Sequence, residues 1–207
     1  MQNNKPVGTW FYKFAWVVLR IFCFIFYPSS ILNRERLERE APFIITANHQ
    51  SMMDPPLIAI HSRKHQIHFL GKDTLRKNAL VRWVLDHLHM IPVARNATDI
   101  GAMRACLAAL KEGHVVGIFP EGTRKEAVMM EKMGSGIGLI ALRSGLPVVP
   151  VLIADKPRMF RKTRLIVGDE IDYEDLKQAG VNKESCEELT RRIKEATYQL
   201  KDLAENK

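Results

Sequence analysis

Residues 43–54 have the sequence FIITANHQSMMD, in which an apolar run leads directly into a group of polar side chains. The run at 43–48 has the length and the β-branched residues that are typical of a buried strand. It brings His49 to the end of that strand, and Asp54 follows five residues later. Because ligands in folds of helices and strands bind where strands end, this stretch is both a fold element and a candidate site.

Five further apolar runs repeat this pattern along the chain, and amphipathic stretches separate them. The other expected strands lie at 67–71, 90–94, 115–120, 147–154 and 164–168. Apolar residues at helical spacing predict helices at 79–88, 99–113, 136–145 and about 183–204, the last of them packed across the sheet. This alternation predicts an α/β fold, with a single domain at 41–207 whose largely parallel or mixed sheet is flanked by helices.

Residues 10–28, WFYKFAWVVLRIFCFIFYP, are almost wholly apolar and differ from the rest of the chain. A helix of this length would extend about 27 Å at ~1.5 Å per residue, close to the ~30 Å of a bilayer core. Lys13 and Arg20 share one helical face, which makes a simple span costly. A true span, a helix packed on the protein's own core and a cleaved signal peptide are the alternatives. We expect residues 1–30 to form a membrane-associated N-terminal helix that lies in the interface and buries Phe14, Val17, Val18, Ile21, Phe24 and Ile25.

Composition and charge limit the classes of partner. With 46% apolar and 26% charged residues, the chain is globular rather than disordered, and its net charge of +8 favours an anionic partner. A phosphate-bearing substrate, an anionic membrane surface and nucleic acid all meet that requirement. The three cysteines are far apart and outside any metal-ligand spacing, which indicates a reducing compartment and packing roles.

The five-residue separation of His49 and Asp54 leaves two interpretations open. On a continuous helix the two side chains would point ~140° apart, so they can meet only if the backbone turns. We expect Pro55 and Pro56 to keep Asp54 out of helical geometry. A carboxylate that holds the imidazole would prepare a general base for a hydroxyl group. Alternatively, Asp54 or Ser51 caps a helix and His49 is merely polar at a turn.

Two other strand ends carry charged residues. The strand at 115–120 leads into Glu121, Thr123 and Arg124, where Gly122 would let the backbone approach a ligand and Arg124 has donors suited to phosphate. Arg95 leaves the strand at 90–94 and could supply a second cation. Taken singly, these residues also fit an ordinary polar turn with a Glu–Arg ion pair and a surface arginine.

Four blocks of sequence, in order over residues 40–155, resemble the glycerolipid acyltransferase family, and within it the 1-acylglycerol-3-phosphate acyltransferases. The first has the family's pattern of a histidine separated by four residues from an aspartate, and the third, FPEGTR, is present without change. The matching residues are Asn48, His49, Ser51 and Asp54; Lys72, Trp83, Ile91, Pro92, Val93 and Arg95; Phe119 to Arg124; and Lys132, Gly134, Pro147 and Pro150.

The resemblance implies roles for these residues. His49 would be the catalytic base and Asp54 would stabilise the imidazolium that forms. Arg95 and Arg124 would hold the phosphate of the acceptor, and Glu121 would orient an arginine or a glycerol hydroxyl. Gly122 and Thr123 belong to the same substrate-binding turn, and Lys72 is a further candidate for the anionic pocket.

The resemblance also implies the reaction. A fatty acyl group would move from acyl-CoA or acyl carrier protein, as co-substrate, to the free hydroxyl of lysophosphatidic acid, giving phosphatidic acid. Another lysolipid acceptor, or a lipid hydrolase of a different mechanism, is the alternative. No metal or redox cofactor is required. We expect the protein at the cytoplasmic face of the cell membrane. Its expected partners are the lysophospholipid, the thioester donor and the membrane surface, with acyl carrier protein as one of the two alternative donors, and no nucleic acid.

The chain departs from the family's pattern at two places, and three stretches resemble motifs of other protein classes. His89 stands where members commonly carry glycine, which would change the wall of the acceptor pocket, and the loop after FPEGTR is short, which would change lipid entry. Ser51 and Ser135 lack the Gly-x-Ser-x-Gly elbow of a serine hydrolase. The histidines of 61–68 indicate a solvated face rather than a metal site. The basic run 156–164 lacks a nucleic-acid motif, and we expect it to face lipid headgroups or acyl carrier protein.

Overall fold

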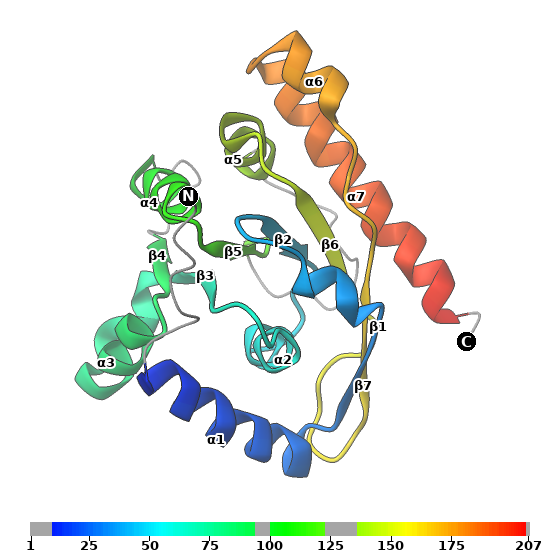
Figure 1. The fold of residues 1–207 in the computed structure, drawn as a ribbon. Coiled ribbons are helices and arrows are strands. Elements are labelled where there is room, and N and C mark those ends of the chain that lie inside the picture. The colour runs from blue at the N-terminus through cyan, green and yellow to red at the C-terminus, as the bar shows by residue number, and fades with distance from the viewer. Residues whose placement is uncertain (1–9, 94–99, 123–135, 206–207) are drawn as a thin grey trace.

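Seven strands form one mixed sheet through the middle of the protein (Figure 1). The structure is a computed structural model and describes residues 10–93, 100–122 and 136–205. The strand order is β1-β7-β6-β2-β5-β3-β4, and every neighbouring pair is parallel except β6 and β7. The strands are β1 (Ser29–Leu32), β2 (Ile44–Ala47), β3 (Ile67–Lys72), β4 (Ile91–Val93), β5 (Val115–Ile118), β6 (Val148–Ile153) and β7 (Thr163–Val167).

Helices cover both faces of the sheet, so the central strands are apolar on both sides. All residues of β2, β5 and β6 are buried, which is why their sequences are continuous apolar runs rather than alternating ones. The helices are α1 (Trp10–Phe26), α2 (Asp54–His61), α3 (Ala79–His87), α4 (Ile100–Lys111), α5 (Gly136–Ser144), α6 (Glu174–Ala179) and α7 (Lys183–Glu205), with short 3-10 helices η1 (Arg34–Glu38) and η2 (Asp73–Lys77).

The two faces have separate hydrophobic cores. One core combines residues of α4, α5 and α7 with Ile44, Val116 and Val148 of the strands. The other combines α2 and the inner side of α1 with residues such as Ile45 and Val149. In Figure 1, α2 is seen end-on between the sheet and α1. The six predicted strands and four predicted helices are confirmed, as is the α/β domain with a mixed sheet flanked by helices.

β1 lies outside the predicted domain boundary of residue 41. It pairs with β7 in parallel, with Ser30 opposite Arg164, so the sheet begins inside the segment 1–30 that was expected to be only a helix. His61 fixes this edge, since its Nε2 lies 2.9 Å from the Oγ of Ser29. A four-residue strand that begins with two serines has no apolar pattern by which the sequence could reveal it.

α2 corrects a second expectation. Asp54 is the first residue of this helix, followed directly by Pro55 and Pro56, so the prolines do not keep Asp54 out of helical geometry. Proline is compatible with the first turn because the N–H groups there have no acceptor within the helix. The prediction failed because it applied the cost of proline in a helix interior to a helix start.

α1 has a packed side and an exposed side. Tyr12 and Cys23 are buried, and the indole Nε1 of Trp16 donates to the carbonyl oxygen of Ala59 in α2 at 3.0 Å. The opposite side exposes large apolar residues, including Phe24 at 82%. Within residues 10–93, 100–122 and 136–205, no helix is long and apolar enough to cross a membrane.

The histidines of 61–68 are used in packing rather than solvated as expected. The ring of His65 hydrogen-bonds the carbonyl oxygen of Arg39 at 2.7 Å. His68 is buried, and its ring stacks between those of His89 and His114, with centroid separations of 5.0 Å and 4.4 Å. These three residues lie at the starts of β3, β4 and β5, whereas His49 follows the end of β2.

His89 occupies a position that favours glycine because its backbone φ is 56°. The imidazole compensates for the strained backbone by stacking on His68. His89 therefore contributes to the amino-terminal edge of the sheet, and the expected effect on an acceptor pocket beside His49 finds no support in this placement.

We expect His68→Phe to make stability less dependent on pH. Burial, with smaller contributions from His114 and His89, lowers the pKa of His68 from 6.5 to about 4. The unfolded chain takes up a proton below pH ~6.5 that the folded protein rejects, so the free energy of unfolding falls from about pH 6.5 to 4, by on the order of 3 kcal/mol. Urea unfolding at several pH values would measure this, and equally steep losses in both proteins would contradict it.

Candidate active site

His49 and Asp54 meet directly in the loop between β2 and α2. The Nδ1 of His49 lies 2.8 Å from Oδ2 of Asp54, so the predicted contact between these side chains is confirmed. The Asp54 side chain is fully buried and the His49 side chain is 16% exposed. One member of the pair is thus fixed in the interior, and the other reaches the surface.

The backbone turns so that the carboxylate of Asp54 closes the loop on itself. Oδ2 accepts hydrogen bonds from the backbone N–H of Gln50 at 2.6 Å and of Ser51 at 2.7 Å. Asp54 also begins α2, where the helix dipole favours a negative charge. The pairing interpretation of Asp54 is therefore confirmed, whereas the cap interpretation is wrong, because the N-cap residue of α2 is Met53 and this helix start has no side-chain cap hydrogen bond.

The hydrogen bond to Asp54 determines which nitrogen of His49 can act as a base. An ionised carboxylate only accepts, so the shared proton is on Nδ1 and the lone pair is on Nε2. Among the residues that the structure describes, none hydrogen-bonds Nε2. This is the arrangement that a general base for a hydroxyl group requires.

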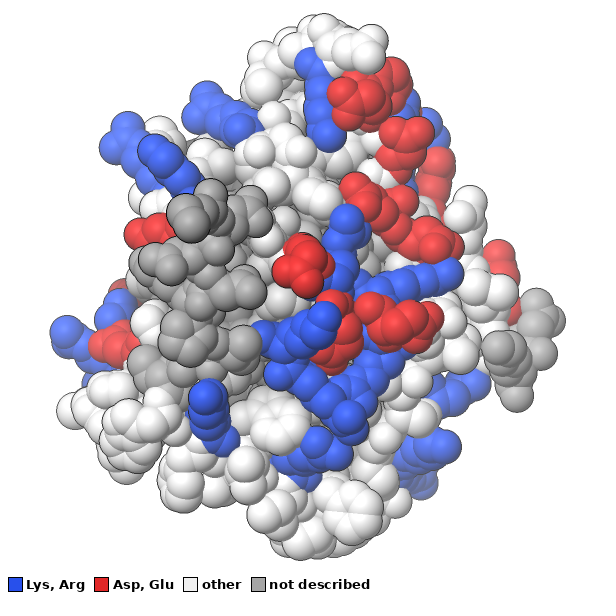
Figure 2. All heavy atoms as spheres, viewed as in Figure 1, with Lys and Arg blue, Asp and Glu red and all other residues white. Residues whose placement is uncertain are grey.

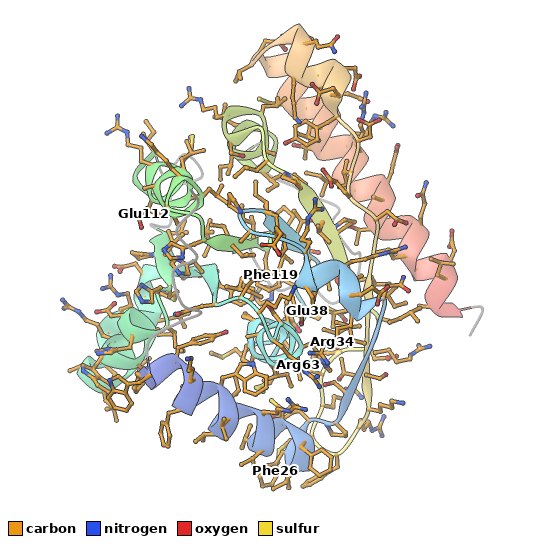
Figure 3. The ribbon with its side chains drawn as sticks, viewed as in Figure 1. Phe26, Arg34, Glu38, Arg63, Glu112 and Phe119 are labelled. Atoms are coloured by element: carbon orange, nitrogen blue, oxygen red, sulfur yellow. The ribbon has the colours of Figure 1, made fainter. Side chains whose placement is uncertain are left out.

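Phe119 holds the ring of His49 from the side. The ring centroids are 4.5 Å apart with planes tilted by 32°, and Phe119 also stacks on Phe69 of β3 at 5.8 Å. Phe119 follows the end of β5 and lies above α2 in Figure 3. Sequence reasoning named Phe119 only as part of a block, and its contact with His49 depends on the adjacency of β2 and β5 in the sheet.

The residues on both sides of His49 are hydrogen-bonded to the backbone of one residue of β6, Ile153. The side chain of Asn48 donates to the carbonyl oxygen of Ile153 at 3.0 Å and accepts from its N–H at 2.8 Å. The Nε2 of Gln50 donates to the same oxygen at 2.7 Å. Sequence reasoning missed this role of Gln50; the only available signal was its position next to His49. These hydrogen bonds fix the backbone that carries the imidazole.

The other predicted site residues are divided between described and undescribed parts of the chain. Lys72 ends β3 and is exposed at the carboxyl end of that strand. Glu121 and Gly122 form a turn directly after β5, and Gly122 has a φ of 63°, which favours glycine. Arg95, Thr123 and Arg124 lie outside the described residues, as do Lys132 and Gly134 of the fourth block.

The Acyltransferase family model matches residues 30–154, which span the sheet from β1 to β6 and include the His49–Asp54 pair. The chain belongs to this Acyltransferase family.

Individual relatives agree with the family. A protein of Bacillus subtilis named 1-acyl-sn-glycerol-3-phosphate acyltransferase is 28% identical over 200 residues, which cover 93% of this chain and 100% of that protein. One of the same name from Borreliella burgdorferi is 30% identical over 64% of this chain and 53% of its own length. The crystal structure of the 1-acyl-sn-glycerophosphate acyltransferase PlsC from Thermotoga maritima has a TM-score of 0.71 at 24% identity, covering 95% of this chain and 82% of that one, which shows a shared fold.

Ser51, the polar residue between the members of this acyltransferase pair, has a structural environment. Its Oγ accepts from the backbone N–H of Met53 at 3.2 Å, and its own N–H donates to Asp54. Both interactions stabilise the entry into α2. A serine nucleophile would need a hydrogen bond from its hydroxyl to Nε2 of His49, and the bonds of Ser51 are to the backbone N–H of Met53 and to Asp54 instead.

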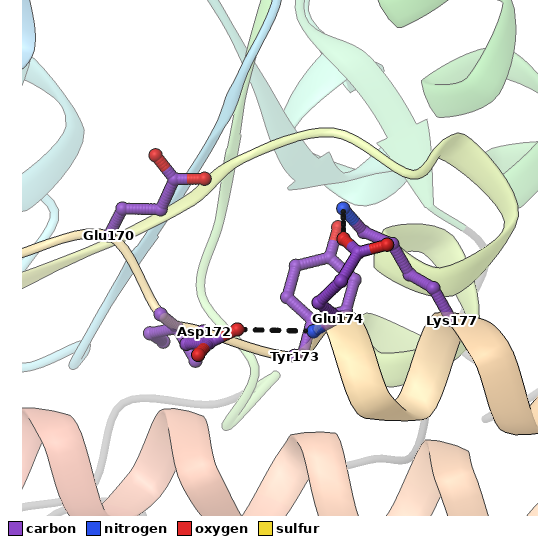
Figure 4. Close-up of a pocket in the computed structure, with 6 residues that line it drawn as sticks. Glu170, Asp172, Tyr173, Glu174 and Lys177 are labelled. Carbon is purple, nitrogen blue, oxygen red and sulfur yellow. Dashed lines mark hydrogen bonds and ion pairs between the residues drawn. The ribbon is translucent and has the colours of Figure 1, made fainter.

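A pocket on the other side of the sheet is unrelated to this pair (Figure 4). It is lined by residues 170–174 and Lys177, and Lys177 already pairs with Glu174 at 2.9 Å while lying over the ring of Tyr173. Tyr173 belongs to the core formed with α4, α5 and α7. Across the described residues, no group of three or more His, Cys, Asp or Glu could hold a metal ion.

We expect Ser51→Ala to keep most of the acyltransferase activity, with a loss of stability of about 1 kcal/mol from the missing hydrogen bond to the backbone N–H of Met53. Mass spectrometry of the protein after incubation with an acyl thioester should then detect no acyl-enzyme. A covalent acyl group on any serine or cysteine would instead indicate a mechanism with a protein nucleophile.

Proposed function

We propose that the protein transfers a fatty acyl group from an acyl thioester to the free hydroxyl of 1-acylglycerol 3-phosphate, giving phosphatidic acid. The observation that carries this proposal is the His49–Asp54 pair. Nδ1 of His49 is hydrogen-bonded to a buried carboxylate, and Nε2 has no hydrogen-bond partner among the described residues. The relatives whose names describe this reaction, and the four sequence blocks, support the choice of acceptor.

In the proposed mechanism the imidazole moves one proton. Nε2 of His49 takes the proton of the acceptor hydroxyl as the oxygen attacks the carbonyl carbon of the thioester. Asp54 stabilises the imidazolium, and collapse of the tetrahedral intermediate breaks the C–S bond. The imidazolium then returns the proton to the departing thiolate, so the enzyme ends unchanged. The thioester carries its own activation, and the mechanism therefore needs neither a metal nor a redox cofactor.

The acceptor's phosphate would bind among cations at the carboxyl ends of the strands. Lys72 lies at the end of β3, and the strands β4 and β5 end shortly before Arg95 and Arg124. A guanidinium fork fits two phosphate oxygens at once. Glu121 would orient an arginine or a glycerol hydroxyl, and Gly122 and Thr123 would line the same turn. The net charge of +8 supports an anionic substrate.

An assay of the purified protein against lysolipid acceptors, with acyl-CoA and with acyl carrier protein thioesters, tests this proposal. We expect 1-acylglycerol 3-phosphate to be the best acceptor, because neutral lysolipids leave the phosphate-binding cations unpaired. Preference for a lysolipid without a phosphate monoester would overturn the acceptor, and release of free fatty acid alone would overturn the transfer reaction.

His49→Ala and Asp54→Asn should each reduce kcat by about 10³-fold or more. The first removes the base. The second keeps an acceptor for the two backbone N–H groups but replaces the charge that stabilises the imidazolium. Thermal unfolding of each variant provides the control for folding. Near-normal kcat in folded samples of both variants would contradict the proposed base.

We further propose that α1 lies in the membrane interface at the cytoplasmic face of the cell membrane. All six residues predicted to enter the interface lie on the exposed side of the helix, from Val17 at 49% to Phe24 at 82% exposure. Lys13 and Arg20 are also exposed, and Arg20 lies over the ring of Trp16 at 5.0 Å. A buried inner side with an apolar outer side supports a helix held between the domain and the lipid.

The variant Val17→Ser/Ile21→Ser/Phe24→Ser should weaken vesicle binding at least about tenfold, because each side chain loses apolar burial in the interface. Turnover of a short-chain, water-soluble acceptor should stay unchanged. Substitutions are sharper here than deletion of residues 1–30, which would also remove part of β1. The matched control is Ile100→Ser/Val181→Ser/Leu203→Ser, at exposed apolar positions elsewhere. Equal vesicle flotation by both variants would overturn the interfacial role of α1.

A further inference from the structure

The loop between β6 and β7 exposes apolar residues at its tip. Met159 is 50% exposed and Phe160 is 68% exposed, although residues of this kind are usually buried. Arg158, Arg161 and Lys162 surround them and are also exposed. We call residues 158–162 the basic tip. Neither the His49–Asp54 pair nor the proposed phosphate site makes use of it.

The basic tip is bonded to the carboxyl end of α1. The backbone N–H of Phe160 donates to the carbonyl oxygen of Phe26 at 2.7 Å, and the rings of these residues are 5.7 Å apart. Thr163 continues the attachment by donating to Pro28 at 2.9 Å. Phe26 is at the lower end of α1 in Figure 3, where the loop also runs in Figure 1. The tip and the exposed side of α1 therefore adjoin one another.

The backbone presents Phe160 in a strained conformation. Its φ of 58° is rare for a bulky side chain and costs on the order of 1 kcal/mol or more. The loop is closed below the tip, where Asp155 accepts from the side-chain Nε of Arg164 at 2.9 Å and from its backbone N–H at 3.1 Å. Apart from its contact with Phe26 the ring is exposed, so the strain brings it little burial within the protein, which indicates a contact that the isolated chain lacks.

The charges of the basic tip are not neutralised within the described part of the protein. Arg158, Arg161 and Lys162 have no carboxylate partner among the described residues, whereas nearby Arg164 pairs with Asp155 and Arg36 pairs with Asp169. Figure 2 shows uncharged atoms along the lower edge of the molecule with basic side chains bordering them. Unpaired guanidinium and ammonium groups around an apolar centre fit a layer of anionic phosphates above hydrocarbon.

We infer that the basic tip is a second membrane contact, selective for anionic lipid, in which Met159 and Phe160 enter the interface and the three cations bind headgroup phosphates. This inference rests on the proposed interfacial position of α1, because the tip adjoins that helix. A single helix lying in an interface leaves the domain free to rotate about the helix axis. A contact from a second element restrains this rotation and keeps one orientation of the domain toward the lipid.

Vesicle flotation of the full chain tests the basic tip. The probes are vesicles of phosphatidylcholine alone and vesicles that also contain phosphatidylglycerol. Arg158→Glu/Arg161→Glu/Lys162→Glu should weaken binding to the anionic vesicles on the order of 100-fold at low salt, and less at high salt. It should change binding to neutral vesicles little, whereas Met159→Ser/Phe160→Ser should weaken binding to both.

The control for net charge is Arg104→Glu/Lys111→Glu/Arg143→Glu, at exposed positions on α4 and α5. Each triple variant lowers the net charge by six, from +8 to +2. Losses of equal size in the two triple variants would overturn the inference, because overall charge alone would then explain lipid binding. Thermal unfolding shows that each variant is folded before flotation.

Two further readouts separate this inference from the proposed function. Turnover of a short-chain soluble acceptor with acyl-CoA should stay at the parent level in the tip variants. If the parent protein shows no such turnover, the proposed reaction is wrong, and the inference about the basic tip is unaffected. If the α1 variant floats normally while the tip variants do not, the proposed role of α1 fails and the tip is the anchor. Normal flotation of the tip variants, with turnover lost only for acyl carrier protein donors, would overturn the membrane contact in favour of a carrier-protein surface.

Discussion

The site depends on the hydrogen bonds that the carboxylate of Asp54 accepts. One of its oxygens accepts hydrogen bonds from the ring Nδ1 of His49 and from the backbone N–H groups of Gln50 and Ser51, and the side chain is completely buried. A buried charge is tolerated only when it is paired and hydrogen-bonded, so the loop cannot relax without exposing or stranding that charge. The same group closes the loop, starts α2 and sets the imidazole tautomer.

The sheet supplies the rigid support for this loop. β2 is central, between β5 and β6, and its end is held by the side-chain amides of Asn48 and Gln50, which hydrogen-bond the backbone of Ile153. Phe119, from the end of β5, completes the support of the ring. Parallel neighbours bring their carboxyl ends to one edge, which is why residues from separate sequence blocks converge there. The partly buried imidazole is thus carried by fully buried strands.

One face of the sheet carries a closed core, and the other carries the proposed membrane contact. The face covered by α4, α5 and α7 is a closed core, and the stacked histidines cover its edge at the starts of β3, β4 and β5. The other face has a thin cover of α2 and α1, and the outer side of α1 is apolar and exposed. Because α2 lies directly between α1 and the sheet, a lipid surface that touches α1 would lie one helix away from the support of His49.

The sequence by itself determined the elements whose signals are local. Strands buried on both faces appear as short apolar runs, and amphipathic helices such as α4 and α7 appear through their spacing, so the α/β fold was predictable. The residue types and five-residue spacing of the His–Asp pair were also visible, and the resemblance over four blocks indicated a catalytic role for them.

The tertiary structure decided what depends on contacts between distant segments. β1 has no apolar pattern and exists because β7 offers it hydrogen bonds. The hydrogen bond of Gln50 to Ile153, the stack of Phe119 on His49 and the bond from Phe160 to Phe26 join residues far apart in the chain. The spacing of residues along the sequence does not predict these contacts, because strand order and loop closure are set by the packing of the whole sheet.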